Sequence, residues 1–280
     1  MIDQAERLRV LAKGELSLPA ARPTGLPRIL AITSGKGGVG KSNIAANLGV
    51  LLCRRGVKTA ILDADLGLSN VEVLLGCPAR YNLGDVMQGG MPISEAWTEG
   101  PAGLKVLSAG SGIDWLANLT SRERQRIILA LMSTDLGLDT LIIDTSPGIA
   151  DNVIDFLRVA DEVFVVTTPE PTSVMDSYAL IKTMSKARLD SRLELIVNAS
   201  PDRQVAEKTA MSIDSICNKF LESSIDAWDW IPYEDNLRSA VTRQRPIVEL
   251  YPASEMSKRL RMASIDIMSR IQWPRMVAPR

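Results

Sequence analysis

An eight-residue segment at residues 35–42, Gly-Lys-Gly-Gly-Val-Gly-Lys-Ser, constrains this 280-residue chain more than any other feature. It follows a compact apolar run at residues 28–33 and precedes residues 42–54, whose apolar residues recur at helical spacing up to Gly56. The order is therefore strand, glycine-rich loop, helix. The segment fits the pattern G-x-x-x-x-G-K-[ST], in which backbone N–H groups and a helix N-terminus surround phosphate oxygens. We predict a phosphate-binding loop.

The alternation of apolar runs and helical stretches continues along the chain. Further strands are predicted at residues 59–63, 104–107, 140–144, 162–167, 193–198 and 227–231, with helices at 122–132, 175–187 and 205–220. Continuous apolar strands between helices are typical of a parallel sheet covered on both faces. We therefore predict an α/β fold of the P-loop NTPase type, with a mostly parallel twisted sheet. Ligands of such sheets bind at the carboxyl ends of the strands.

Two terminal segments flank this predicted ATPase domain at residues 28–253. Residues 1–27 read as a short amphipathic helix and a proline-rich linker, and residues 254–280 as an amphipathic helix and tail. The apolar stripe of the second helix consists of Met256, Leu260, Ala263, Ile267 and Ile271. Such a stripe packs against the protein's own core or enters a lipid surface, and the sequence leaves both alternatives open.

The amino-acid composition limits the kinds of binding and catalysis that this chain can carry out. Lysine plus arginine (32) nearly balances aspartate plus glutamate (33), so the molecule lacks the strong positive field that favours nucleic-acid binding. Histidine is absent, which excludes catalytic triads that use histidine and metal sites with histidine ligands. Cys53, Cys77 and Cys217 are too far apart for a metal site and are expected to be thiols in a reducing cytosol. No apolar run is long enough to span a bilayer, so we expect a cytoplasmic protein, at most peripheral on the inner face of the cell membrane.

The glycine-rich loop assigns several roles directly. Lys41 is expected to pair with the β- and γ-phosphates of ATP, and the Ser42 hydroxyl to ligate Mg²⁺. Asp144 ends an apolar strand, as a residue that holds the metal through water would. A lone aspartate at a strand end is also a common helix N-cap, which is the alternative for each such residue. The predicted nucleotide-binding residues are Gly35, Lys36, Gly37, Gly38, Val39, Gly40, Lys41, Ser42 and Asn43.

The run Lys-Gly-Gly-Val-Gly-Lys-Ser at residues 36–42 resembles the deviant Walker A loop of the MinD/ParA ATPase family. The resemblance implies that Lys36 crosses a dimer interface to the partner's nucleotide, so that ATP favours a homodimer and hydrolysis releases it. It further implies that Asp65 orients the attacking water, that Asp63 supports the metal shell, and that Asn198 hydrogen-bonds adenine. The division of roles between Asp63 and Asp65 stays open. A solvated loop lysine and an ordinary turn former are the alternatives for Lys36 and Asn198.

Several longer stretches look like one branch of that family, the FlhG (FleN, YlxH) flagellar number regulators. They are residues 63–76, 166–176 and 231–252, and the resemblance covers residues 28–268. The segment Asp-Gln-Ala-Glu-Arg-Leu-Arg at residues 3–9 is similar to the D-Q-A-x-x-L-R segment of the branch. It implies that this segment, through Asp3, Gln4, Leu8 and Arg9, binds and stimulates an FlhF-type GTPase of the signal-recognition class. The alternative is a helix that only packs on its own domain.

Two positions depart from the family pattern. Ser42 stands where many members have threonine, which supplies the same hydroxyl to Mg²⁺. Residues 145–148 read Thr-Ser-Pro-Gly rather than the Thr-Gly-Ala-Gly type that is frequent in the flagellar branch. This second difference bears on the hydrolysis rate and on the mobility of the segment, because proline fixes φ and removes a donor.

Taken together, the residues and the resemblance predict a Mg-dependent, dimer-activated ATP hydrolase that regulates flagellar number or placement. Its expected partners are a second copy of itself, an FlhF-like GTPase and flagellar switch (C-ring) proteins. It is also expected to bind the inner membrane surface reversibly. A MinD-type division-site regulator and a ParA-type DNA-partition ATPase are the alternatives, and the near-neutral charge disfavours the second. A metal carrier would need a bridging cysteine pair, and a tyrosine kinase would end in a tyrosine cluster; the chain has neither pattern.

Overall fold

The computed structural model describes residues 26–65, 70–110, 119–133, 136–221 and 224–277. The predicted N-terminal helix lies outside the described residues, and so do Asp3, Gln4, Leu8 and Arg9 of the predicted partner-binding segment.

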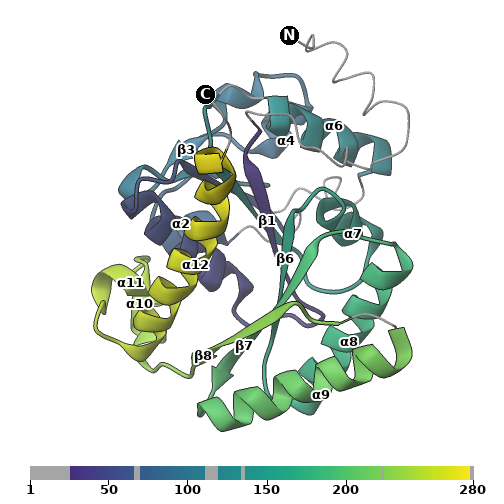
Figure 1. Cartoon of the computed structure of the whole chain (residues 1–280). Coiled ribbons are helices and arrows are strands. Elements are labelled where there is room, and N and C mark those ends of the chain that lie inside the picture. The colour runs from purple at the N-terminus through teal and green to yellow at the C-terminus, as the bar shows by residue number, and fades with distance from the viewer. Residues whose placement is uncertain (1–25, 66–69, 111–118, 134–135, 222–223, 278–280) are drawn as a thin grey trace.

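A single twisted sheet organises the described residues (Figure 1). Its strands are β1 (Arg28–Thr33), β2 (Thr59–Ala64), β3 (Thr98–Glu99), β4 (Lys105–Leu107), β5 (Thr140–Thr145), β6 (Glu162–Thr167), β7 (Arg192–Ser200) and β8 (Ala227–Pro232). They lie in the order β3-β4-β2-β5-β1-β6-β7-β8. Every neighbouring pair is parallel except β3 with β4, which is antiparallel. The predicted α/β fold with a mostly parallel sheet is confirmed.

Helices cover both faces of the sheet. They are α2 (Lys41–Arg54), α3 (Val71–Leu75), α4 (Leu83–Met87), α6 (Ser121–Ser133), α7 (Asp151–Leu157), α8 (Pro171–Lys186), α9 (Arg203–Leu221), α10 (Asn236–Thr242), α11 (Ile247–Leu250) and α12 (Glu255–Val277), with 3-10 turns at Ile93–Glu95 and Pro101–Gly103. Helix α8 begins four residues before the predicted start, because Pro171 occupies its first turn, where proline is favoured. The helices of seven residues or fewer were not predicted, since they are too short to show a periodic pattern.

Alternate side chains of the strands build two separate cores. In β1, Ile29 and Ala31 join the core beneath α6 to α9, whereas Leu30 and Ile32 join the core beneath α2 and α12. Both faces of the central strands are therefore buried, which explains why they read as unbroken apolar runs. The two helix layers are visible on opposite sides of the strands in Figure 1.

The apolar stripe of α12 faces the protein's own core in this structure. Met256, Leu260 and Ile267 are each 1% exposed and Ile271 is 6% exposed, and α12 packs against α2 and β8. Of the two alternatives left by the sequence, the structure therefore has this stripe packed inside. None of the helices in the described residues combines the length and the apolar character needed to cross a bilayer. The assignment of residues 254–280 as a separate segment stays a prediction.

Candidate functional site

The loop between β1 and α2 has the backbone shape of a phosphate cradle. Gly38 and Gly40 adopt positive φ angles of 78° and 96°, and Gly40 is the N-cap of α2 without any side-chain cap. A Cβ atom at Gly35 would lie 2.2 Å from the backbone of Asp176, and one at Gly40 would lie 2.4 Å from Nδ2 of Asn198. Glycine is therefore required at position 35 by the close approach of Asp176 and favoured at positions 38 and 40 by φ. The uncapped N-terminus of α2 leaves backbone N–H groups for an anion.

The two lysines of the loop have different surroundings. Lys41 begins α2 and is 7% exposed. The side chain of Lys36 is 39% exposed, and its Nζ contacts Oε2 of Glu170 at 2.9 Å and Oγ1 of Thr172 at 3.0 Å. Both contacts lie at the start of α8. Lys41 is thus enclosed by its own chain, whereas Lys36 is held at the surface.

Asp63 and Asp144 meet across two neighbouring strands. They are register partners in β2 and β5, and they are 1% and 0% exposed. Burial raises the pKa of Asp144 to about 8, and the negative charge of Asp63 adds to the rise, while the Ser42 hydroxyl and the Lys41 ammonium offset part of it. Among the described residues, neither carboxylate oxygen of Asp144 accepts a hydrogen bond of normal geometry. The compensation of this buried carboxyl group within its own chain is therefore incomplete.

These surroundings fit a magnesium ion. The unpartnered Asp144 oxygens and the nearby Ser42 hydroxyl are oxygen donors of the kind that Mg²⁺ prefers. Within the described ranges, no group of three or more acidic or cysteine side chains surrounds one point. Magnesium at this place would therefore need phosphate oxygens and water as its remaining ligands, as nucleotide-bound magnesium usually does.

Asp63 also organises the segment that follows β2. Its Oδ1 accepts the N–H of Asp65 at 3.1 Å, and its Oδ2 accepts the N–H groups of Asn70 and Val71 at 2.8 and 3.0 Å. The carboxylate thus holds both ends of a loop whose residues 66–69 lie outside the described residues. The structure shows Asp63 in this supporting role, and its predicted contribution to the metal shell stays a prediction.

Asn198 lies at the carboxyl end of β7 and is 6% exposed. Its Nδ2 donates to the carbonyl of Val39 in the phosphate loop at 2.7 Å. The side chain therefore supports the loop directly, which the sequence did not indicate. The predicted hydrogen bond from Asn198 to adenine stays a prediction.

Other residues at the site had not been singled out as contacts from the sequence. Glu170 and Thr172 meet Lys36 across more than 130 residues of chain, and the Ser146 hydroxyl donates to Oδ1 of Asp65 at 2.9 Å. The N–H of Gly148 donates to the carbonyl of Ser34 at 2.8 Å, which ties the segment after β5 to the phosphate loop. No local pattern indicates these pairs, because they depend on β5 and β6 lying beside β1 and on β2 lying beside β5.

Three features define a P-loop NTPase. They are the strand-loop-helix cradle, its buried lysine, and the paired aspartates at the carboxyl ends of β2 and β5. The family model described as "ParA: NUBPL iron-transfer P-loop NTPase" matches residues 25–268. The chain therefore belongs to the ParA/MinD family of P-loop ATPases, as the loop sequence predicted.

The chain is also similar to individual proteins of known name. The chain is 34% identical to the antiactivator FleN of Pseudomonas aeruginosa over 253 residues, which cover 90% of this chain and 89% of FleN. It is 37% identical over 174 residues to the flagellum site-determining protein YlxH of Helicobacter pylori, covering 62% of this chain and 58% of YlxH. Among solved structures, MinD of Pyrococcus horikoshii in complex with Mg-ADP has the same fold, with a TM-score of 0.71 at 22% identity and coverage of 86% of this chain and 96% of that one.

Proposed function

We propose that the chain is a Mg-dependent ATPase switch, monomeric with ADP and dimeric with ATP, that regulates the number or placement of flagella. The names of two relatives, an antiactivator FleN and a flagellum site-determining protein, support the flagellar setting. Similarity to FleN extends over 90% of the chain, which supports a shared role for the whole domain rather than for one motif.

The contrast between the two loop lysines is the observation on which the proposed switch rests. Lys41 is buried beside its own cradle, whereas the Lys36 ammonium lies at the surface, 2.9 Å from Glu170. An exposed pair of this kind contributes little to stability, so Lys36 can leave Glu170 at small cost. We propose that Lys36 then reaches the terminal phosphate bound by a second copy of the chain. Its charge would offset phosphate charge that a single chain leaves exposed, so ATP would favour the dimer.

Within one site, we assign the following roles. Lys41 and the backbone N–H groups of the loop bind the phosphates, and Asp65 orients the attacking water. The Ser42 hydroxyl and Asp144 would hold magnesium, with Asp63 in support. Magnesium, when bound, neutralises charge that develops on the phosphate oxygens. Binding a dication beside Asp144 would also favour its charged form, because a neighbouring positive charge opposes the rise in pKa caused by burial.

Two partners follow from the proposed flagellar role. An FlhF-like GTPase is proposed to be bound and stimulated through Asp3, Gln4, Leu8 and Arg9. The dimer is proposed to bind flagellar switch proteins. Pull-down with purified FlhF-like and switch proteins tests this, with Gln4→Ala as the first variant. Loss of GTPase stimulation by Gln4→Ala, with ATP hydrolysis unchanged, is the expected result. If stimulation survives Gln4→Ala and removal of residues 1–11, the segment is not the activator.

Reversible membrane association is proposed on the resemblance, and the packing of α12 sharpens its test. Deleting residues 255–280 would remove the core side chains Met256 and Leu260 together with any lipid contact. Met262 and Ile265 point outward, at 59% and 47% exposed, so Met262→Glu with Ile265→Glu perturbs the outer face alone. Liposome sedimentation with ATP separates the two faces. Unchanged binding by both the deletion and the double variant would exclude α12 as the anchor.

Sizing chromatography with ATP and with ADP tests the switch itself. Wild type should elute as a dimer only with ATP, Lys36→Ala and Lys41→Ala as monomers, and Asp65→Ala as a dimer trapped by unhydrolysed ATP. The two lysine variants are distinguished by binding of a fluorescent ATP analogue, which Lys36→Ala should retain and Lys41→Ala should lose. If all four proteins elute alike, the proposed switch has no basis.

A MinD-type division-site regulator is the second candidate, favoured by the likeness to the MinD fold. The higher coverage and identity of the FleN match favour the flagellar reading. A ParA-type DNA-partition role is disfavoured by the formal net charge of −1. A salt-dependent shift of DNA mobility in the presence of ATP would support the DNA role, and capture of a division-site activator instead of an FlhF-like protein would support the MinD role.

A further inference from the structure

The segments that follow β2 and β5 are connected by a side-chain hydrogen bond. Ala64 and Thr145 are register partners at the ends of these strands, so the next residues, Asp65 and Ser146, are neighbours. Oγ of Ser146 lies 2.9 Å from Oδ1 of Asp65 and 3.5 Å from the carbonyl oxygen of Ala64. A serine hydroxyl that donates to a carboxylate makes a charge-assisted hydrogen bond, which is stronger and shorter than a neutral one.

The turn that presents Ser146 is itself held in place. Thr145 Oγ1 donates to the carbonyl of Ile32 at 3.2 Å, and the Gly148 N–H donates to the carbonyl of Ser34 at 2.8 Å. A Cβ atom at Gly37 would lie 3.7 Å from the ring of Pro147, so the proline lies beside the phosphate loop. The backbone that carries Ser146 is thus held by the contacts of Thr145 and Gly148, and Pro147 restricts the backbone between these two residues.

Asp65 is held at one oxygen and open at the other. Its N–H donates to Asp63 and its Oδ1 accepts from Ser146, whereas Oδ2 accepts no hydrogen bond within the described part of the chain. Both Asp65 and Ser146 are half-buried. The open oxygen can therefore accept a hydrogen bond from water while the hydroxyl of Ser146 restricts the rotation of the carboxylate.

We propose that Ser146 is a positioning residue for ATP hydrolysis, acting through Asp65. The inference rests on the proposed role of Asp65 in orienting the attacking water. A carboxylate held by one donor has fewer orientations than a free one, and correct orientation of a water nucleophile contributes to rate. In the flagellar branch that the chain resembles, glycine is frequent at this position, and glycine offers no hydroxyl. Ser146 thus adds to the segment after β5 a contact that glycine cannot make.

The test uses the full chain and measures phosphate release. Ser146→Ala should lower kcat about 10-fold, as the loss of one charge-assisted hydrogen bond implies, with KM for ATP and the ATP-bound dimer fraction unchanged. Ser146→Thr should restore most of kcat, because it returns the hydroxyl. Ser191→Ala is the matched control: this serine hydroxyl donates to the carbonyl of Ala160 at 2.8 Å, at the opposite end of the sheet, and its loss should leave kcat unchanged.

A double-mutant cycle separates the inference from the function on which it rests. If Ser146 acts through Asp65, Ser146→Ala should have no further effect in an Asp65→Ala background. Normal hydrolysis by Asp65→Ala would overturn the proposed role of Asp65. Strongly impaired hydrolysis by Asp65→Ala together with a normal kcat for Ser146→Ala would overturn only the positioning role. So would a loss of the ATP dimer, a raised KM at constant kcat, or failure of Ser146→Thr to recover activity.

Discussion

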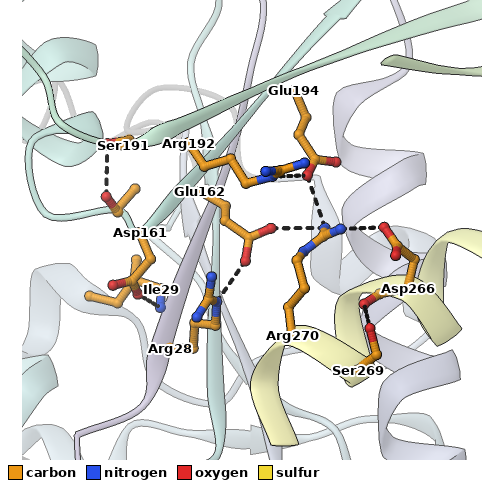
Figure 2. Close-up of polar contacts among 11 residues, drawn as sticks. Arg28, Ile29, Asp161, Glu162, Ser191, Arg192, Glu194, Asp266, Ser269 and Arg270 are labelled. Atoms are coloured by element: carbon orange, nitrogen blue, oxygen red, sulfur yellow. Dashed lines mark hydrogen bonds and ion pairs between the residues drawn. The ribbon is translucent and has the colours of Figure 1, made fainter. Parts of the chain in front are cut away.

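The two ends of the central sheet both bury carboxylates, but they compensate them differently. At the amino ends of β1, β6 and β7, Glu162 is 0% exposed and contacts Arg28 at 2.6 Å and Arg270 at 2.8 Å (Figure 2). Glu194 contacts Arg192 at 2.8 Å and Arg270 at 3.1 Å. Glu162 and Glu194 thus each have two guanidinium partners from their own chain. Arg270 belongs to α12, so the network also fastens that helix to the sheet.

At the carboxyl ends, the compensation is incomplete. Asp144 is 0% exposed, lies beside Asp63, and has a pKa raised to about 8 by burial first and by Asp63 second. An internal pair stabilises a fixed structure, whereas a buried charge without its counter-charge is costly unless a ligand supplies it. The difference between the ends therefore separates a structural charge network from a binding site. Three variants test this contrast.

The largest change in the free energy of unfolding is expected at the amino ends of the strands. Arg270→Ala would leave Glu162 with Arg28 alone and should lower the free energy of unfolding by about 4 kcal/mol, since removing one partner of a buried pair leaves charge uncompensated. Urea denaturation at pH 7 measures this change. Arg245→Ala is the control, because that side chain is 58% exposed and 3.6 Å from Glu249, and it should cost less than about 0.5 kcal/mol. Equal small losses for both variants would remove the structural role of the network.

The second effect, at the carboxyl ends, has the opposite sign. The folded pKa of Asp144, about 8, lies above its ordinary value of 3.8, so the unfolded chain loses this proton first. The contribution of Asp144 to the stability of the nucleotide-free protein should therefore be fully present below about pH 4 and fall as the pH rises towards 8. Asp144→Asn should remove this slope and stabilise the protein by about 3 kcal/mol at pH 8, while abolishing hydrolysis.

Denaturation at pH 5.5 and pH 8, without magnesium or nucleotide, checks the Asp144 prediction. Asp190→Asn changes an exposed carboxylate away from the site and serves as the control. Destabilisation by Asp144→Asn at pH 8 would mean that the carboxylate is compensated within the chain after all, and the contrast between the two ends would disappear.

The smallest effect on stability is expected at Glu170, the exposed partner of Lys36. Glu170→Gln should change the free energy of unfolding by less than about 0.5 kcal/mol, because this side chain is 65% exposed. It should nevertheless lower the ATP concentration for half-maximal dimer formation about threefold, since Lys36 would leave a weaker partner. Glu99→Gln is the control: Glu99 is 68% exposed and paired with Lys105 at 2.8 Å. An unchanged ATP dependence for Glu170→Gln would indicate that this pair does not compete with the dimer.

Local patterns were sufficient for much of the fold. Residues 28–33 and 162–167 were predicted as strands with the bounds that the structure has, because buried parallel strands are continuous apolar runs. The phosphate loop was predicted with its flanking strand and helix, since glycine spacing and one lysine are contained in eight consecutive residues. Very short elements such as α3, with five residues, and β3, with two, were missed, because so few residues do not show a period.

The sequence by itself thus determined the alternating strands and helices, the cradle for phosphate and the aspartates at the carboxyl ends of β2 and β5. These features depend on neighbouring residues and on backbone preferences that act over one or two turns. Only the tertiary structure decided that Lys36 meets Glu170, that Ser146 meets Asp65, and that Arg270 joins α12 to Glu162. Those pairs join residues 81 to 134 positions apart, so they arise from the order of the strands and from the packing of α12, which no short stretch of sequence specifies.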